Sequence, residues 1–165
     1  MTDFHILYRN CGAAVRRFAL FLCGNEALAD DITSETFVRA WKARGKIRET
    51  TVKAYLFTIA RNLYRDHLRN HRLMNELDET ICDPRIDLES QTAQKAQVRA
   101  VMLMLQQLSE IDRTALLMRV QEEMSYEEIA VALQLPLTTV KVKVHRARLK
   151  LIKARAALQE VQSCR

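Results

Sequence analysis

Apolar residues recur along this chain at the spacing of helix faces, and short polar stretches separate the recurrences. The pattern predicts helices over about 4–23, 26–43, 52–72, 92–108, 111–122, 126–133 and 138–155. Gly24 is placed to end the first helix, and Asn25, Ser109 and Ser125 are placed to cap later ones. Gly 3 and Pro 2 are too few turn formers for a β-sandwich or barrel, so we expect an all-α fold.

Each predicted helix has an apolar face that should pack into a core. The inward side chains should be Leu7, Val15, Phe18, Leu22, Leu28, Ile32, Phe37, Trp41, Leu56, Ile59, Ala60, Leu63, Val98, Val101, Met102, Leu105 and Leu108. The third helix, capped by Thr50 or Thr51, is unusual because its other surfaces are aromatic and basic together. They carry Tyr55, Phe57, Arg61, Asn62, Tyr64, Arg65 and Arg69. Aromatic rings can stack on unpaired bases while cations hold phosphates, so this helix suits single-stranded nucleic acid.

The last predicted helix is strongly basic on one side and apolar on the other. Seven of the eighteen residues in 138–155 are Lys or Arg, and none is acidic. Val140, Val144, Ala147 and Leu151 share its inner face. The preceding helix begins with the capping box Ser125 to Glu128, a tight connection contains Pro136, and Thr138 or Thr139 is placed to cap the basic helix. This succession predicts a helix-turn-helix.

In a helix-turn-helix the second helix enters the major groove. Val142, His145, Arg146 and Leu149 should point most directly outward. We expect Arg146 and Lys141 to contact bases, and Lys143 and Arg148 to hold the phosphate backbone. The residues from Leu149 onward should pack on a partner.

Charge divides the chain into three parts. Residues 1–72 carry 13 basic and 7 acidic side chains, residues 73–95 carry 2 and 6, and residues 96–165 carry 11 and 7. The middle part contains Pro84 and loses hydrophobic periodicity. We therefore expect two small helical domains, 1–72 and 96–165, joined by a flexible acidic linker, 73–95.

The sequence offers little for catalysis or metal binding. The cysteines at Cys11, Cys23, Cys82 and Cys164 lack CxxC spacing and are expected to be free thiols. His67 and His71 lie among arginines that would repel a cation. No HExxH, glycine-rich phosphate loop or GxSxG motif occurs. We expect no catalytic residue, no metal, no cofactor and no enzymatic activity.

The N-terminal stretch does not have the features of a secretory signal. It begins MTDFHILYRN, with an early acidic residue and no long apolar core. The longest apolar run, Phe18 to Cys23, is far short of a membrane span, so no membrane insertion is expected. We expect a cytoplasmic protein.

Three motifs together resemble the bacterial RNA polymerase sigma factors of the extracytoplasmic-function (ECF) type. ALADDITSETFVRAW (27–41) is similar to the family's AEDLxQExFxRAW, and YLFTIARNLYRDHLR (55–69) is similar to WLFxIARNxxxDxxR. LSEIDRTALLMR (108–119) and MSYEEIAVALQLPLTTVKVKVHRARLKL (124–151) resemble the family's C-terminal domain. The resemblance covers about residues 8–155, in the family's order and spacing.

The resemblance implies a non-enzymatic initiation factor that binds core RNA polymerase and promoter DNA. Residues 1–72 would bind the clamp coiled coil of the β′ subunit and would melt and read the downstream promoter element. Residues 96–165 would read the upstream element as duplex, and the linker would run through the polymerase cleft. The β subunit is a further expected contact, and an anti-sigma factor is an expected partner.

The site residues implied by position fall into three groups. Polymerase contacts would be Asp31, Ser34, Glu35, Phe37 and Arg39. Downstream-element contacts would be Arg44, Lys46, Arg48, Tyr55, Arg61, Asn62, Arg65, Asp66 and Arg69. Upstream-element contacts would be Thr139, Lys141, Val142, Lys143, His145, Arg146 and Arg148. This chain has Ser34 where relatives usually have Gln, Tyr55 where Trp is frequent, and Val142 where Ser is common.

Two other functions fit parts of the pattern. A helix-turn-helix repressor or activator acting without polymerase would explain residues 96–165, but it leaves the paired helices of 27–69 without a role. A protein-interaction module without a DNA role leaves seven unopposed basic residues on one helix unexplained.

Overall fold

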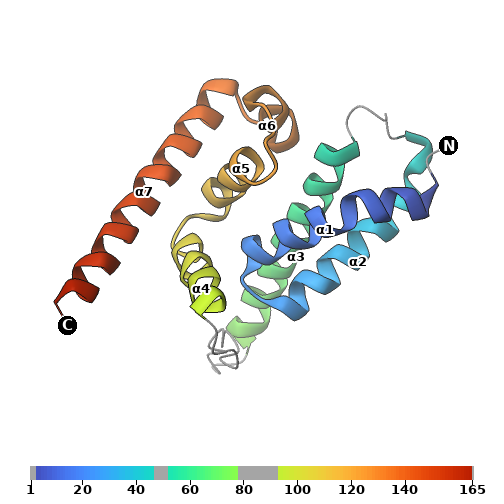
Figure 1. The fold of residues 1–165 in the computed structure, drawn as a ribbon. Coiled ribbons are helices and arrows are strands. Elements are labelled where there is room, and N and C mark those ends of the chain that lie inside the picture. Colours follow the sequence, from blue (N-terminus) through green and yellow to red (C-terminus); the bar gives the residue numbers. More distant parts are fainter. Residues whose placement is uncertain (1–2, 47–51, 78–92, 165) are drawn as a thin grey trace. The chain divides into compact units, whose positions relative to one another are not determined.

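The computed structural model describes residues 3–46, 52–77 and 93–164, and every regular element in these ranges is helical (Figure 1). The chain forms two compact units, residues 1–90 and 91–165. The all-α prediction is therefore confirmed. Within the described ranges, no helix is both long enough and apolar enough to cross a membrane.

The described residues of the first unit form three long helices and one short turn of 3₁₀ helix. They are α1 (Phe4–Cys23), α2 (Glu26–Lys42), η1 (Arg44–Lys46) and α3 (Val52–Leu77). Gly24 ends α1 in the left-handed conformation, with φ 70°, and its N–H donates to the Leu20 carbonyl. Asn25 then caps α2 by accepting a hydrogen bond from the Leu28 N–H. Both sequence predictions at this turn are confirmed.

The core of the first unit lies where α1, α2 and α3 meet. Phe18 and Phe57 are fully buried, with ring centroids 4.9 Å apart. Phe57, Arg61 and Tyr64 were expected on outer surfaces of α3, but they are buried. The reason is that α3 packs against both α1 and α2, so its buried arc is wider than one apolar stripe. Trp41, expected in the core, is instead partly exposed.

Between residues 93 and 164, the second unit forms four helices, which are α4 (Ala93–Gln106), α5 (Glu110–Val120), α6 (Tyr126–Leu133) and α7 (Leu137–Ser163). Ser109 caps α5, and Ser125 with Glu128 forms the predicted capping box at the start of α6. The predicted threonine cap of the basic helix is wrong. The helix begins at Leu137 after Pro136 and has no side-chain cap, so Thr138 and Thr139 lie inside its first turn.

The core of the second unit is centred on α5, which is buried on almost every side from Asp112 to Met118. Val140, Val144 and Ala147 of α7 are fully buried against the unit, as their spacing predicted. Val98 and Val101 of α4 were expected inside but are exposed, because α4 packs mainly through Met102 and Leu105.

The ends of the helices differ from the sequence prediction around the acidic segment. Helix α3 continues to Leu77, and α4 begins at Ala93. The predicted caps Thr50 and Thr51, the side chain of Arg48, Cys82 and most of the predicted linker lie outside the described residues.

Candidate nucleic-acid interface

Helices α6 and α7 are joined by a tight turn, as in a helix-turn-helix. Gln134 ends α6 in the left-handed conformation, with φ 54°, and the Leu135 N–H donates to the Ala130 carbonyl at 3.0 Å. Pro136 follows at once and α7 begins at the next residue. Only three residues, 134–136, therefore separate α6 from α7, as is usual in a helix-turn-helix.

The outer side of α7 carries most of the predicted upstream-element residues. Lys141, Val142, His145 and Arg148 are exposed, and Thr139 is half-buried. Val142 is 60% exposed although it is aliphatic. An exposed valine has no hydrogen-bonding group, so among base edges it suits the methyl group of thymine.

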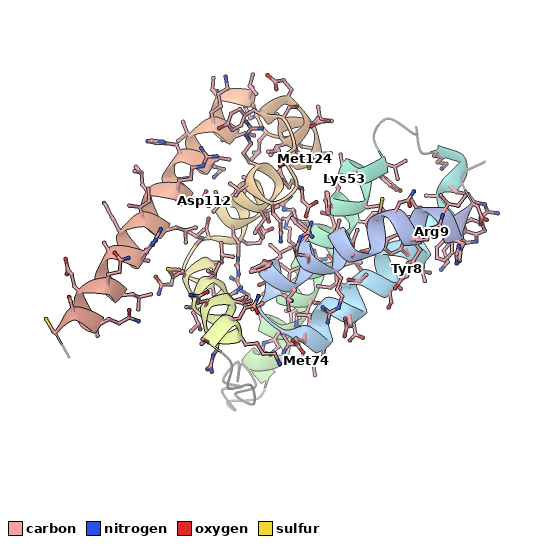
Figure 2. The ribbon with its side chains drawn as sticks, viewed as in Figure 1. Tyr8, Arg9, Lys53, Met74, Asp112 and Met124 are labelled. Carbon is pink, nitrogen blue, oxygen red and sulfur yellow. The ribbon has the colours of Figure 1, made fainter. Side chains whose placement is uncertain are left out.

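Two of the predicted contacts, Lys143 and Arg146, turn toward a buried carboxylate of α5. The Asp112 side chain is 4% exposed, and its Oδ1 lies 3.3 Å from Nη2 of Arg146 and 3.6 Å from Nζ of Lys143. Figure 2 shows Asp112 on α5, in the part of the unit where α5 packs against α7. Lys143 is consequently only 18% exposed at its side chain, whereas Arg146 is 50% exposed.

A second contact orients Lys141 from the start of α6. Its Nζ lies 5.9 Å from the centroid of the Tyr126 ring, and the Arg119 guanidinium lies 4.7 Å from the same centroid. Arg119 also donates to the Met124 carbonyl at 2.9 Å. Cations within about 6 Å of a ring face are attracted by its quadrupole. Tyr126 therefore connects Arg119 at the end of α5 with Lys141 on the outer side of α7.

Sequence reasoning missed the roles of Asp112 and Tyr126. Ser109 was identified as the cap of this helix, and the Asp112 N–H donates to Ser109 Oγ at 3.3 Å. The available signal was that this acid lies in a run that is otherwise inward-facing, so its carboxylate needed a cationic partner. The spacing of 34 residues to Arg146 concealed the partner.

In the first unit, α2 and α3 together form a basic surface depression of about 440 Å³. It is lined by Arg39, Asn62, Arg65, Asp66 and Arg69. Within it Arg69 pairs with Asp66 at 2.5 Å. Four of the predicted downstream-element residues are thus brought together, and Arg39, predicted as a polymerase contact, joins them. Three arginines in one depression make it suited to a phosphate backbone.

The remaining downstream-element residues are dispersed. Arg61 is buried in the core, and Tyr55 is half-buried. Lys46 is exposed in η1. The Arg44 guanidinium stacks 4.1 Å from the Trp41 ring centroid and donates to the Trp41 carbonyl at 2.9 Å, which explains why Trp41 stays at the surface.

The predicted polymerase contacts on α2 divide into surface and core residues. Asp31 and Ser34 are exposed, and Glu35 pairs with Arg39 at 2.9 Å. Phe37 is 1% exposed and lies edge-on to the Tyr8 ring, with centroids 4.8 Å apart. Phe37 can therefore act on a partner only through the helix surface that it supports.

Asp30, one turn before Ser34 on α2, pairs with Arg16 of α1. The Asp30 Oδ1 lies 2.7 Å from Nε of Arg16. The hydrogen bond from Arg16 to Asp30 raises the pKa of the Arg16 guanidinium and so favours its charged form. Tyr8 and Arg9 of α1, both labelled in Figure 2, line the same surface depression as Arg16 and Asp30.

Side chains that could bind a metal do not cluster in the described parts of the chain. No group of three or more His, Cys, Asp or Glu side chains there is placed to hold a metal ion. His67 and His71 lie with ring centroids 6.0 Å apart on the exposed side of α3, in the company of arginines.

Each of the two units matches a known protein family. Residues 7–73 match the family described as sigma-70 region 2, and residues 98–151 match sigma-70 region 4. The ECF RNA polymerase sigma factor EcfG of Rhodopseudomonas palustris is 33% identical, over 84% of this chain and 77% of that protein. The RNA polymerase sigma-H factor of Pseudomonas aeruginosa is 34% identical, over 76% and 72%. The ECF sigma factor SigM of Bacillus subtilis is 30% identical, over 83% and 85%.

Two solved structures share the fold. The sigma factor RpoE of Bartonella quintana, determined in complex with the anti-sigma factor NepR, matches with a TM-score of 0.85 at 24% identity, over 94% of this chain and 98% of that one. CnrH, determined in complex with the cytosolic domain of CnrY, matches with a TM-score of 0.72 at 26% identity, over 93% and 88%.

Proposed function

Since the chain belongs to the ECF family of RNA polymerase sigma factors, which direct transcription initiation, we propose that it binds core polymerase and brings it to a particular subset of promoters. The observation that carries the proposal is the combination, in one chain, of a region 2-like three-helix unit and a region 4-like helix-turn-helix. One DNA-reading unit suffices for a repressor, whereas a factor that spans a promoter needs two.

The two units have different tasks under this proposal. The domain of residues 1–72 binds the β′ clamp coiled coil through the exposed residues of α2, and it melts and reads the downstream element with α3. The depression between α2 and α3 supports this task, because it gathers Arg39, Arg65 and Arg69 beside Asn62. The domain of residues 96–165 reads the upstream element as duplex through α7, and residues 73–95 connect the two.

The proposal extends to partners and place of action. Contact with the β subunit accompanies the β′ contact, and an anti-sigma factor holds the protein inactive. Support for the latter comes from RpoE, which was solved with the anti-sigma factor NepR. The protein works in the cytoplasm, where bacterial polymerase meets DNA, and it contributes binding and positioning but no bond chemistry of its own.

Transcription in vitro tests the proposal directly. Purified protein is mixed with core polymerase and a pool of promoter fragments from the source genome. We expect promoter-specific transcripts and co-elution of the protein with core enzyme. If neither appears, the proposal is wrong. Sequence-specific duplex binding that is unaffected by polymerase would instead support the repressor alternative, which no structural observation favours.

A charge reversal on α2 sharpens the same experiment. Asp31→Arg should reduce core binding at least tenfold, since it places a cation where the proposed contact is acidic. Glu26→Arg is the matched control, because it makes the same charge change at an exposed position about 140° around the same helix. Equal core affinity for the two variants would count against the assignment of this face.

A further inference from the structure

The cluster of Asp112, Lys143 and Arg146 is an ion-pair triad between a core helix and the reading helix. A carboxylate that is 4% exposed is costly unless cations and hydrogen bonds compensate it. Both compensating cations come from α7, and both approach the same oxygen, Oδ1. The triad thus pairs the buried Asp112 carboxylate of α5 with two α7 side chains, Lys143 and Arg146, that are expected to contact DNA.

The two cations are held in different ways. Lys143 is 18% exposed, so its ammonium is directed inward and is largely withheld from a phosphate. Arg146 is half-exposed and approaches Asp112 through Nη2. A guanidinium is a planar fork with five N–H donors, so one edge can rest on the carboxylate while another faces a base.

We propose that Asp112 is a positioning residue that sets the specificity of the upstream reading helix. It fixes the plane of Arg146 for one base and holds Lys143 away from the DNA backbone. Asp112 thereby lowers sequence-independent affinity and raises discrimination. The proposal rests on the proposed function only in so far as the DNA that is read is a promoter.

The salt dependence of binding to arbitrary DNA tests the first half and needs no polymerase. The probe is a short duplex of fixed, arbitrary sequence, bound by the full-length protein. Asp112→Asn should bind it more tightly, and log K against log salt should steepen by about 1 as Lys143 gains a phosphate. Glu127→Gln is the control, since it removes one exposed acidic charge from the same unit without touching α7.

A second pair of variants keeps this test decisive if Asp112→Asn is poorly folded. Lys143→Gln should leave the salt slope unchanged, because Lys143 is already withheld from phosphate. Arg148→Gln, at an exposed position one turn further along α7, should flatten the slope by about 1. Flattening by Lys143→Gln that equals that of Arg148→Gln would overturn this half of the proposal.

Base preference tests the second half. The probe is a promoter library with a randomised upstream element, transcribed by core polymerase with the protein. Asp112→Asn should lose about tenfold of preference at one base position and keep the others. In an Arg146→Ala background the same substitution should change nothing further, because Asp112 acts through Arg146.

Unchanged base preference in Asp112→Asn would overturn the positioning role. A uniform loss at all positions, with a lowered melting temperature, would also overturn it and make Asp112 a structural residue. If the wild-type protein supports no initiation from the library, the proposed function fails, while the salt experiment still decides whether Asp112 restrains Lys143.

Discussion

Phe37 illustrates how a buried side chain can serve a binding surface. It lies on the helix that carries the proposed polymerase contacts, yet it is closed off from solvent by packing against Phe4 and Tyr8. Its ring contacts with α1 fix the rotation of α2 about its own axis. Phe37 therefore contributes to the way in which α2 presents Asp31 and Ser34, which are exposed.

Removing the Phe37 ring should destabilise the first unit strongly. Phe37→Ala leaves a cavity in a packed core, and we expect the free energy of unfolding to fall by about 3–5 kcal/mol. Val38→Ala, at the adjacent exposed position, should change it by roughly 0.5 kcal/mol or less. Urea denaturation followed by circular dichroism measures both. A wild-type midpoint for Phe37→Ala would contradict the packing described for α2.

At the scale of the elements, local capping decides where the helix-turn-helix begins. The Ser125 side chain accepts from the Glu128 N–H at 3.1 Å, and Glu128 accepts from the Ser125 N–H at 2.7 Å. Helix α6 has only eight residues, so it depends on this reciprocal cap more than a long helix would.

Loss of the cap should therefore weaken the second unit. Ser125→Ala should lower its free energy of unfolding by about 1 kcal/mol, since the Glu128 N–H loses its acceptor. Ser163→Ala is the control, because that hydroxyl sits on the exposed last turn of α7 and bonds only to its own helix. Thermal melting of the two variants compares them. Equal melting temperatures would show that the capping box contributes nothing to α6.

Helix positions were predictable from the sequence because their signals are local. Gly24, Asn25, Ser109 and Ser125 each act within a few residues of their own position. The start of α7 was not predicted correctly, because Pro136 can precede a helix without a side-chain cap.

The composition of the candidate sites was less predictable, because it depends on contacts distant in sequence. The burial of Phe57 could be predicted only from the knowledge that α3 packs against two helices, α1 and α2. The ion pair of Arg146 could be predicted only if the position of Asp112 on α5, 34 residues earlier and facing α7, were already known. Periodicity identifies which face of a helix is apolar, but it does not identify which polar residue of another helix meets it.

At the scale of the whole molecule, each unit has its own core. In the first, α1, α2 and α3 pack on one another; in the second, α5 packs against α6 and α7. Chain segments that complete separate cores can open separately, which fits the proposal that each unit engages a different promoter element.

The two units should therefore unfold as two transitions in differential scanning calorimetry. Phe37→Ala should lower the temperature of one transition and Ser125→Ala that of the other, because each substitution affects only its own core. A single transition that both substitutions lower would mean that the two units form one cooperative body.

Helix α7 is anchored only along its first half. Its fully buried residues end at Ala147, and after Ala154 every described side chain is exposed, through Cys164. An unsupported helical segment of this length is marginal in water. Amide hydrogens should consequently exchange slowly near Val140 and Val144 and progressively faster toward Ser163. The local stability of α7 should thus decrease along the helix. Its N-terminal half, which carries the proposed DNA contacts, should stay folded, whereas the backbone hydrogen bonds near Ser163 should open often enough for this end to change conformation when a partner binds.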